Sequence, residues 1–130
     1  MPRAYTVATA ALALGMPTKW VDNVLSHNKI AGIRHGRQGI ARRLSIEGIL
    51  TLALTALLVH ELGISTSKAI AIAVGVVEAD GRHPCGGGLV VEINLATFQS
   101  RLLERLENAV EVAPVPRRGR PPTNKTGRLD

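Results

Sequence analysis

The segment from Ser45 to Gly63, SIEGILTLALTALLVHELG, is apolar on nearly every side of the helix that its length and composition favour. Ser45 is a suitable N-cap, Glu47 suits the first turn, and Gly63 can end the helix. The apolar run contains His60 and Glu61 and is shorter than the ~20 residues that a bilayer span requires. The segment therefore predicts the buried central helix of a small core, and no membrane partner is expected.

Three other segments with helical spacing can cover this central helix. One begins at the cap Thr6 and ends at Gly15, and a second lies within residues 16–30, MPTKWVDNVLSHNKI, with Thr18 as its expected cap. A third follows the central helix over residues 65–81. The first two are separated by only about three residues, which is the tight spacing of a helix-turn-helix.

Residues 32–45, GIRHGRQGIARRLS, concentrate positive charge on a stretch too short for a helix. Four arginines lie here, and no carboxylate occurs between Asp22 and Glu47. Two glycines bracket an Arg-Gln pair, as in a hairpin tip, so residues 31–45 predict a small two-stranded wing. Because an isolated two-stranded hairpin is only marginally stable in water, this wing is expected to pack against the helices.

The chain after the fourth helical segment has a different pattern. Residues 81–88, GRHPCGGG, predict a loop, residues 89–95, LVVEINL, predict a strand, and residues 97–110, TFQSRLLERLENAV, predict a helix. This strand and helix have little left to bury against within one chain, which favours a two-fold partner. Packing in cis onto the first part of the chain is the alternative.

Together these segments predict a mainly α fold with a small β wing. We divide it into a winged helix-turn-helix over residues 1–81, a strand-helix dimerisation segment over 82–112 and a basic tail over 113–130. The tail, APVPRRGRPPTNKTGRLD, has no apolar periodicity and is predicted to be disordered.

The net charge of +6 is divided unevenly along the chain. Residues 1–45 hold seven Lys and Arg against one Asp, and residues 114–130 hold five against one. Residues 46–113 instead hold four Lys and Arg against eight Asp and Glu. Two basic blocks of this kind favour a polyanion partner, because each cation docked on a phosphate releases a condensed counterion. Solubility alone is the other explanation of such blocks.

Residues 5–75 resemble the DNA-binding domain of the MerR family of bacterial transcription regulators. The matching motifs follow the order of the family, with YTVATAALALG and PTKWVDNVLSHNKI as two helices, GIRHGRQGIARRLS as the wing and ELGIS at the end of the central helix. Leu44 stands where that family usually has a tyrosine at the end of the wing. The tail motif PRRGRPP is similar to the AT-hook, whose Arg-Gly-Arg core lies in the minor groove of A·T-rich DNA.

The candidate DNA-binding residues lie on the second helix, in the wing and in the tail. Lys19, Asn23 and His27 would face the major groove, where an asparagine can read an adenine edge. Wing arginines would meet phosphates or the adjacent minor groove, and Trp20 is interpreted as a core residue rather than a base-stacking platform. The full set is Thr18, Lys19, Asn23, His27, Arg34, Arg37, Arg42, Arg43, Arg117, Arg118, Gly119 and Arg120.

The remaining sequence features do not indicate a disulfide framework, a metal site or a catalytic site. Cys85 is the only cysteine, which excludes an internal disulfide framework and favours a reducing compartment. His83 lies two residues before it, but no second pair at ligand spacing follows, so no metal or cofactor is expected. No phosphate-binding glycine loop, catalytic triad or carboxylate pair is recognisable, and an enzyme is not expected.

The sequence thus predicts a cytoplasmic, nucleoid-associated homodimer that binds double-stranded DNA, with a preference for A·T-rich sites supplied by the tail. Its expected role is transcription regulation. Two alternatives stay open. An excisionase-like or architectural factor would bend DNA, and an antitoxin-type interaction module would use the acidic middle and C-terminal helix to neutralise a partner protein.

Overall fold

The apolar segment forms helix α3 (Ile46–Leu62), and other helices pack against it in the computed structural model, which describes residues 4–34 and 42–112. The Ser45 hydroxyl accepts a hydrogen bond from the Gly48 N–H at 3.3 Å, and Gly63 ends the helix with a φ of +66°. Both predicted ends are therefore confirmed. Most residues of the helix are buried, including Leu52 and Thr55. No helix within the described ranges is both long and apolar enough to cross a bilayer.

Helices α1 (Val7–Leu14) and α2 (Thr18–His27) follow one another closely, as the sequence predicts. The Thr6 hydroxyl accepts a hydrogen bond from the Thr9 N–H at 3.1 Å, and Gly15 ends α1 with a φ of +69°. The expected cap of α2 is wrong. Pro17 occupies the N-cap position in an extended conformation, and Thr18 is the first helical residue. No side chain caps the first turn of α2.

A three-stranded sheet joins the wing to the start of the chain. Strand β3 (Arg43–Ser45) lies between β1 (Ala4–Tyr5) and β2 (Ile33–Arg34), and both pairings are antiparallel. Leu44 is fully buried, and the register places it opposite both Tyr5 and Ile33. The predicted pairing of the two wing ends is confirmed, whereas β1 was not predicted. The predicted hairpin tip, with Arg37, lies outside the described residues.

The base of the wing sits tightly against the first turn of α3. Gly32 has a φ of +88°, and its carbonyl accepts a hydrogen bond from the Ser45 N–H at 2.8 Å. A Cβ at Gly32 would lie 2.8 Å from the Gly48 nitrogen, so a side chain there would push the wing off the helix. The close approach therefore requires glycine and fixes the wing relative to the core.

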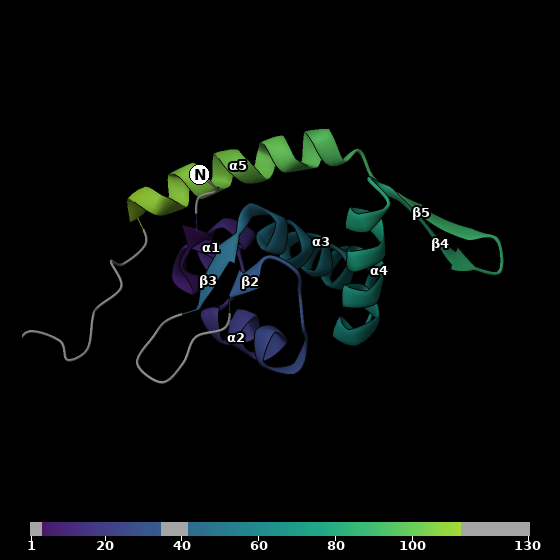
Figure 1. Ribbon diagram of the computed structural model, residues 1–130, viewed down its shortest axis with the longest axis horizontal. Helices are drawn as coiled ribbons and strands as arrows, with labels where there is room; N and C mark the ends of the chain where they lie inside the picture. Colours follow the sequence, from purple (N-terminus) through teal and green to yellow (C-terminus); the bar gives the residue numbers. More distant parts are fainter. Residues whose placement is uncertain (1–3, 35–41, 113–130) are drawn as a thin grey trace, which may run out of the picture.

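Helix α4 (Thr66–Glu78) packs along α3 and leads into a second, two-stranded sheet of β4 (Arg82–Gly86) and β5 (Leu89–Glu92). The loop predicted for residues 81–88 is wrong over most of its length, because β4 pairs with the valine-rich β5. The turn-forming residues that suggested a loop are concentrated at the hairpin tip, where three consecutive glycines, Gly86, Gly87 and Gly88, have positive φ. Figure 1 shows this hairpin projecting from the helical body.

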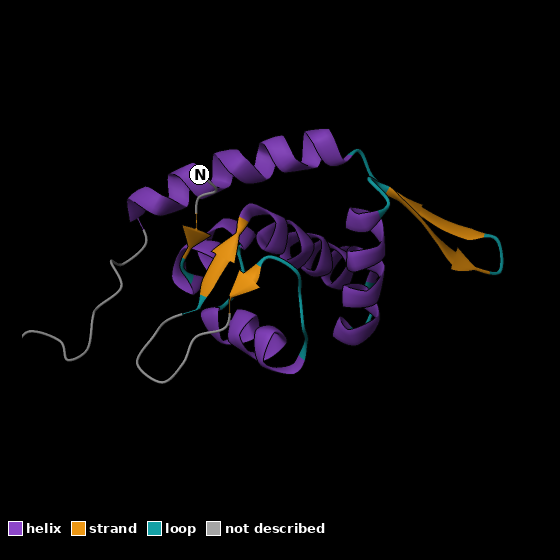
Figure 2. Ribbon diagram, in the orientation of Figure 1, coloured by secondary structure: helices purple, strands orange, loops and turns teal. Residues whose placement is uncertain are grey.

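The last helix, α5 (Leu95–Val112), lies along the body on the side away from α2 (Figures 1 and 2). It packs against α1 through Leu102, Leu106 and Ala109, which belong to the same buried cluster as the apolar residues of α1, α2 and α3. The chain thus adopts the cis packing that the sequence left as an alternative for this helix, while dimerisation stays a prediction. The fold is mainly helical with two small antiparallel sheets.

Candidate nucleic-acid interface

The solvent-facing side of α2 is a continuous polar stripe. Lys19, Asn23, Ser26 and His27 are exposed, and their spacing places them on one side of the helix. The opposite side is buried through Val21, Val24 and Leu25. The apolar stripe therefore orients α2 so that its polar side chains face outward.

Trp20 lies at the border between these two sides. It is half-buried and packs against the main apolar cluster. The interpretation of Trp20 as a core residue is confirmed by this packing.

Arg42 connects the wing to α2. Its guanidinium donates one hydrogen bond to Asp22 Oδ1 at 3.0 Å and another to Ser26 Oγ at 3.1 Å. The Arg42 side chain is 25% exposed and that of Asp22 is 49% exposed. The contact holds Arg42 against α2, and its expected role at a phosphate stays a prediction.

Arg43 is exposed at the start of β3, and the β2–β3 register places its backbone opposite that of Arg34. Like charges at directly opposed strand positions cost stability. Across the described residues, 4–34 and 42–112, the only ion pair is the one between Arg42 and Asp22, so no described carboxylate neutralises Arg43. Positive charge is therefore left unbalanced at the base of the wing.

The His27 ring is oriented by its own helix. Its Nδ1 lies 2.8 Å from the carbonyl oxygen of Asn23, and because a carbonyl only accepts, Nδ1 must carry the proton. The Nε2 atom is then the one available to a partner. No described atom hydrogen-bonds the side-chain amide of Asn23 or the ammonium group of Lys19, so both are also available.

The structure brings together most of the predicted residues that it describes. Thr18 is exposed at the start of the helix whose stripe carries Lys19, Asn23 and His27, and Arg42 links this helix to β3 with Arg43. Arg34 is placed by its backbone only. The predicted sites Arg37, Arg117, Arg118, Gly119 and Arg120 lie outside the described residues.

Sequence reasoning missed the role of Asp22. It is the one carboxylate of residues 1–45 and lies four residues before Ser26 on α2, so both can face one long side chain from the wing. One acidic residue among seven basic residues was the sequence signal that could have indicated an ion pair at Asp22.

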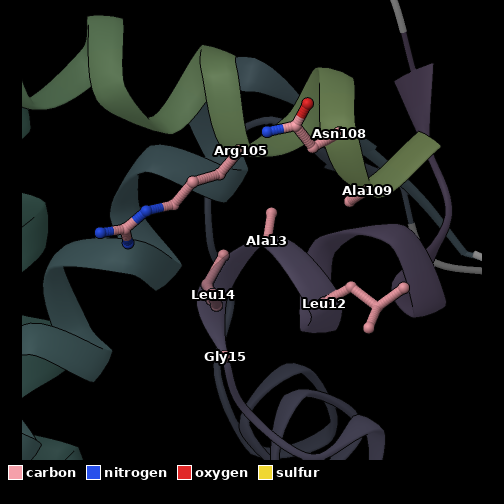
Figure 3. Close-up of a pocket in the computed structure, with 7 residues that line it drawn as sticks. All are labelled: Leu12, Ala13, Leu14, Gly15, Arg105, Asn108 and Ala109. Carbon is pink, nitrogen blue, oxygen red and sulfur yellow. The ribbon is translucent and has the colours of Figure 1, made fainter. Parts of the chain in front are cut away.

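Two cavities of about 450 Å³ each lie beside α1 and α5, away from the polar stripe of α2. Ala13, Leu14 and Arg105 line both of them. Figure 3 shows the first, a groove between α1 and α5, with Ala13 pointing from α1 toward α5. Neither cavity is lined by a residue of α2 or of the wing. In the part of the chain that the structure describes, no group of three or more His, Cys, Asp or Glu side chains could hold a metal ion.

No protein-family model, no curated protein and no solved structure matches this chain. A functional assignment therefore rests on the chemistry of α2 and the wing.

Proposed function

We propose that this chain binds double-stranded DNA through α2 and the wing, as the winged helix-turn-helix of a transcription regulator. The observation that carries the proposal is the exposed stripe of Lys19, Asn23 and His27 on a helix whose other side is buried. The major groove of B-DNA admits one α-helix and presents donors and acceptors that such side chains can bind. Arg43 follows Arg42 in the chain and is exposed, so it would add a second basic group from the wing.

The residues divide between positioning and base reading. Lys19 and Arg43 would bind phosphates, which fixes the register of the protein on the duplex without reading sequence. Asn23 would donate to and accept from an adenine edge, and the Nε2 atom of His27 would bind a base edge or a phosphate. Because no side chain caps the first turn of α2, its backbone N–H groups beside Thr18 can also meet a phosphate.

Arg42 has a positioning role in this proposal. Asp22 is the only carboxylate of residues 1–45, and alone it would repel phosphates. The hydrogen bonds from Arg42 to Asp22 and Ser26 neutralise that charge and tie the wing to α2. The two elements would then dock on DNA as one surface.

The tail would add a second contact. Arg118 and Arg120 flank Gly119 in the AT-hook-like motif, and arginines of this kind bind the narrow, strongly negative minor groove of A·T tracts. The tail would thus favour operators that have A·T-rich sequence beside the site read by α2.

The experiment that tests the function is selection of bound duplexes from a random pool, followed by salt titration of the selected site. The full chain should bind saturably, and its affinity should fall steeply with salt, with a slope of about 0.9 per phosphate contact. A Lys68→Ala variant, which removes an exposed lysine on α4, is the matched control and should keep the affinity. Absence of saturable duplex binding at low salt would overturn the proposal.

A further inference from the structure

The β4–β5 hairpin has two unprotected features. Both of its strands are edges, because its sheet contains no other strand, and Leu89 and Val90 on β5 are exposed. A two-stranded hairpin is marginal by itself in water, and a free strand edge is a template for pairing with another chain. The hairpin points away from the helical body, so its edges are accessible (Figure 1).

The hydrogen-bond pattern of the hairpin shows which backbone groups face outward. The Ile93 N–H donates to the Gly81 carbonyl at 2.7 Å, which makes these two residues a bonded pair of the antiparallel ladder. Bonded and non-bonded pairs alternate, so His83 and Val91 form the next bonded pair. The non-bonded pairs on either side of His83 and Val91 are Arg82 with Glu92 and Pro84 with Val90. The C=O groups of these four residues, and the N–H groups of all except proline, point away from the hairpin.

The two free edges are therefore unequal. On β4 one of the outward positions is Pro84, which has no N–H, and proline at such a position is a natural block to strand pairing. On β5 both Val90 and Glu92 offer an outward N–H and an outward carbonyl. Of the two strands of the hairpin, β4 makes more of the contacts with α4 than β5 does. Among the described residues no hydrogen bond occupies these β5 groups.

We propose that β5 pairs antiparallel with β5 of a second copy of this chain, around a two-fold axis at Val91. Val90 would exchange two hydrogen bonds with Glu92 of the second copy, and the symmetry repeats the exchange, so all outward groups of both residues are satisfied. The two hairpins would form one four-stranded sheet.

The charges of β5 favour a second copy in this register. Each Glu92 carboxylate lies opposite Val90 of the other copy, whereas a register centred on Glu92 would place two carboxylates face to face at a cost in stability. The pairing also covers part of the exposed Val90 side chain. The strand can thus satisfy its own outward hydrogen-bonding groups in this register without placing like charges directly opposite each other. This dimer does not depend on DNA binding, and its tests are made without DNA.

Sedimentation equilibrium of the full chain tests the proposal, with one variant that blocks the edge and one that does not. The mass should rise from the 13.8 kDa of one chain toward twice that value as concentration increases. Val90→Pro removes an outward N–H from each copy but no hydrogen bond within the hairpin, so the dimer should weaken by roughly tenfold or more. The matched control Val90→Ala keeps the N–H and should dimerise within a few-fold of the parent chain.

Disulfide trapping gives an independent readout if Val90→Pro disturbs folding. In the proposed register the two copies of residue 91 are a non-bonded pair with Cα atoms about 4.5 Å apart, within disulfide range. Cys85→Ser with Val91→Cys should therefore form a covalent dimer under mild oxidation. Cys85→Ser with Glu92→Cys should not, because those residues are offset along the strands.

Three results would overturn the inference. The parent chain could stay at one-chain mass throughout the concentration range. It could dimerise equally well with Val90→Pro, which would place the interface on another face. The Val91→Cys variant could remain uncrosslinked while the protein is dimeric, which would exclude this register.

Discussion

Arg42 Nη1 lies 3.0 Å from Asp22 Oδ1, and this contact joins two elements that are twenty residues apart in the sequence. It is the one ion pair among the described residues, and it links the end of the wing to the proposed recognition helix. The pair is too exposed to contribute much to folding, since ion pairs of this type are worth about 0–1 kcal/mol. Its importance lies in the position and charge of the surface that it organises.

A double-mutant cycle of Asp22→Ala and Arg42→Ala should separate the contribution of this ion pair to folding stability from its contribution to DNA binding. In urea denaturation we expect a coupling energy of only about 0.2–1 kcal/mol, because solvent screens both side chains. Duplex affinity should respond differently. Arg42→Ala should weaken binding and Asp22→Ala should restore part of the loss, because the unpaired carboxylate is then removed. If Asp22→Ala fails to improve the Arg42→Ala variant, the carboxylate does not face the DNA.

Lys19 and Asn23 should give different signatures in DNA binding. Lys19→Ala should weaken binding to all duplexes alike and reduce the salt slope by about 1, because one phosphate contact is lost. Asn23→Ala should leave the slope unchanged, cost about 1–3 kcal/mol at the selected site and relax its preference for adenine there. Fluorescence anisotropy titrations on the selected site and on a single-base variant measure both effects. Equal losses on both duplexes for Asn23→Ala would argue against base reading.

Leu44 is the apolar centre of the small sheet, opposite both Tyr5 and Ile33 and with no exposed surface. Leu44→Ala should lower the free energy of unfolding by about 2–5 kcal/mol, the range for a fully buried leucine. Leu12→Ala is the control, since Leu12 is 49% exposed and its truncation should cost within about 0.5 kcal/mol. Urea titration followed by circular dichroism compares the two, and similar losses would show that the sheet adds little to the core.

The parts of the fold that the sequence predicts are those decided by neighbouring residues. Thr6 and Ser45 accept hydrogen bonds from N–H groups three residues later, and Gly15 and Gly63 have positive φ just after a helix. Caps of this kind depend on a single turn of chain, so residue type and order are enough to find them. The exception is Thr18, where Pro17 fixes the extended backbone one residue earlier.

The parts that the sequence did not predict depend on contacts between distant segments. Residues 82–86 have weak strand preference alone and become β4 only because β5 supplies a partner. The docking of α5 on α1 brings Leu106 into the same buried cluster as apolar residues of α1, α2 and α3, all of which lie at least fifty residues earlier. At the candidate site, the exposed stripe of α2 follows from helical spacing, whereas the contact from Arg42 to Asp22 depends on how the wing folds back.

Gly32 and Gly63 offer a matched pair for testing how closely the wing must approach the core. Both have positive φ, so alanine at either position costs about 1–2 kcal/mol in backbone strain. A Cβ at Gly63 meets nothing within 4 Å, but at Gly32 it would lie 2.8 Å from the Gly48 nitrogen. Gly32→Ala should therefore lower the melting temperature more than Gly63→Ala and should also weaken duplex binding. Equal shifts in melting temperature would mean that the wing can move aside freely.

The role of the tail can be tested with two double variants that each remove two positive charges, one pair inside the AT-hook-like motif and one pair outside it. Arg118→Ala with Arg120→Ala removes two positive charges from the AT-hook-like motif, and Lys125→Ala with Arg128→Ala removes two outside it. If the motif enters the minor groove, only the first pair should abolish the preference for A·T-rich over G·C-rich flanks, because only those arginines sense groove width. Both pairs remove the same charge, so non-specific attraction should weaken similarly. Competition binding with the two flanking sequences measures the preference. An equal loss of preference in both variants would reduce the tail to a source of charge, and the site on α2 and the wing would then carry all sequence recognition.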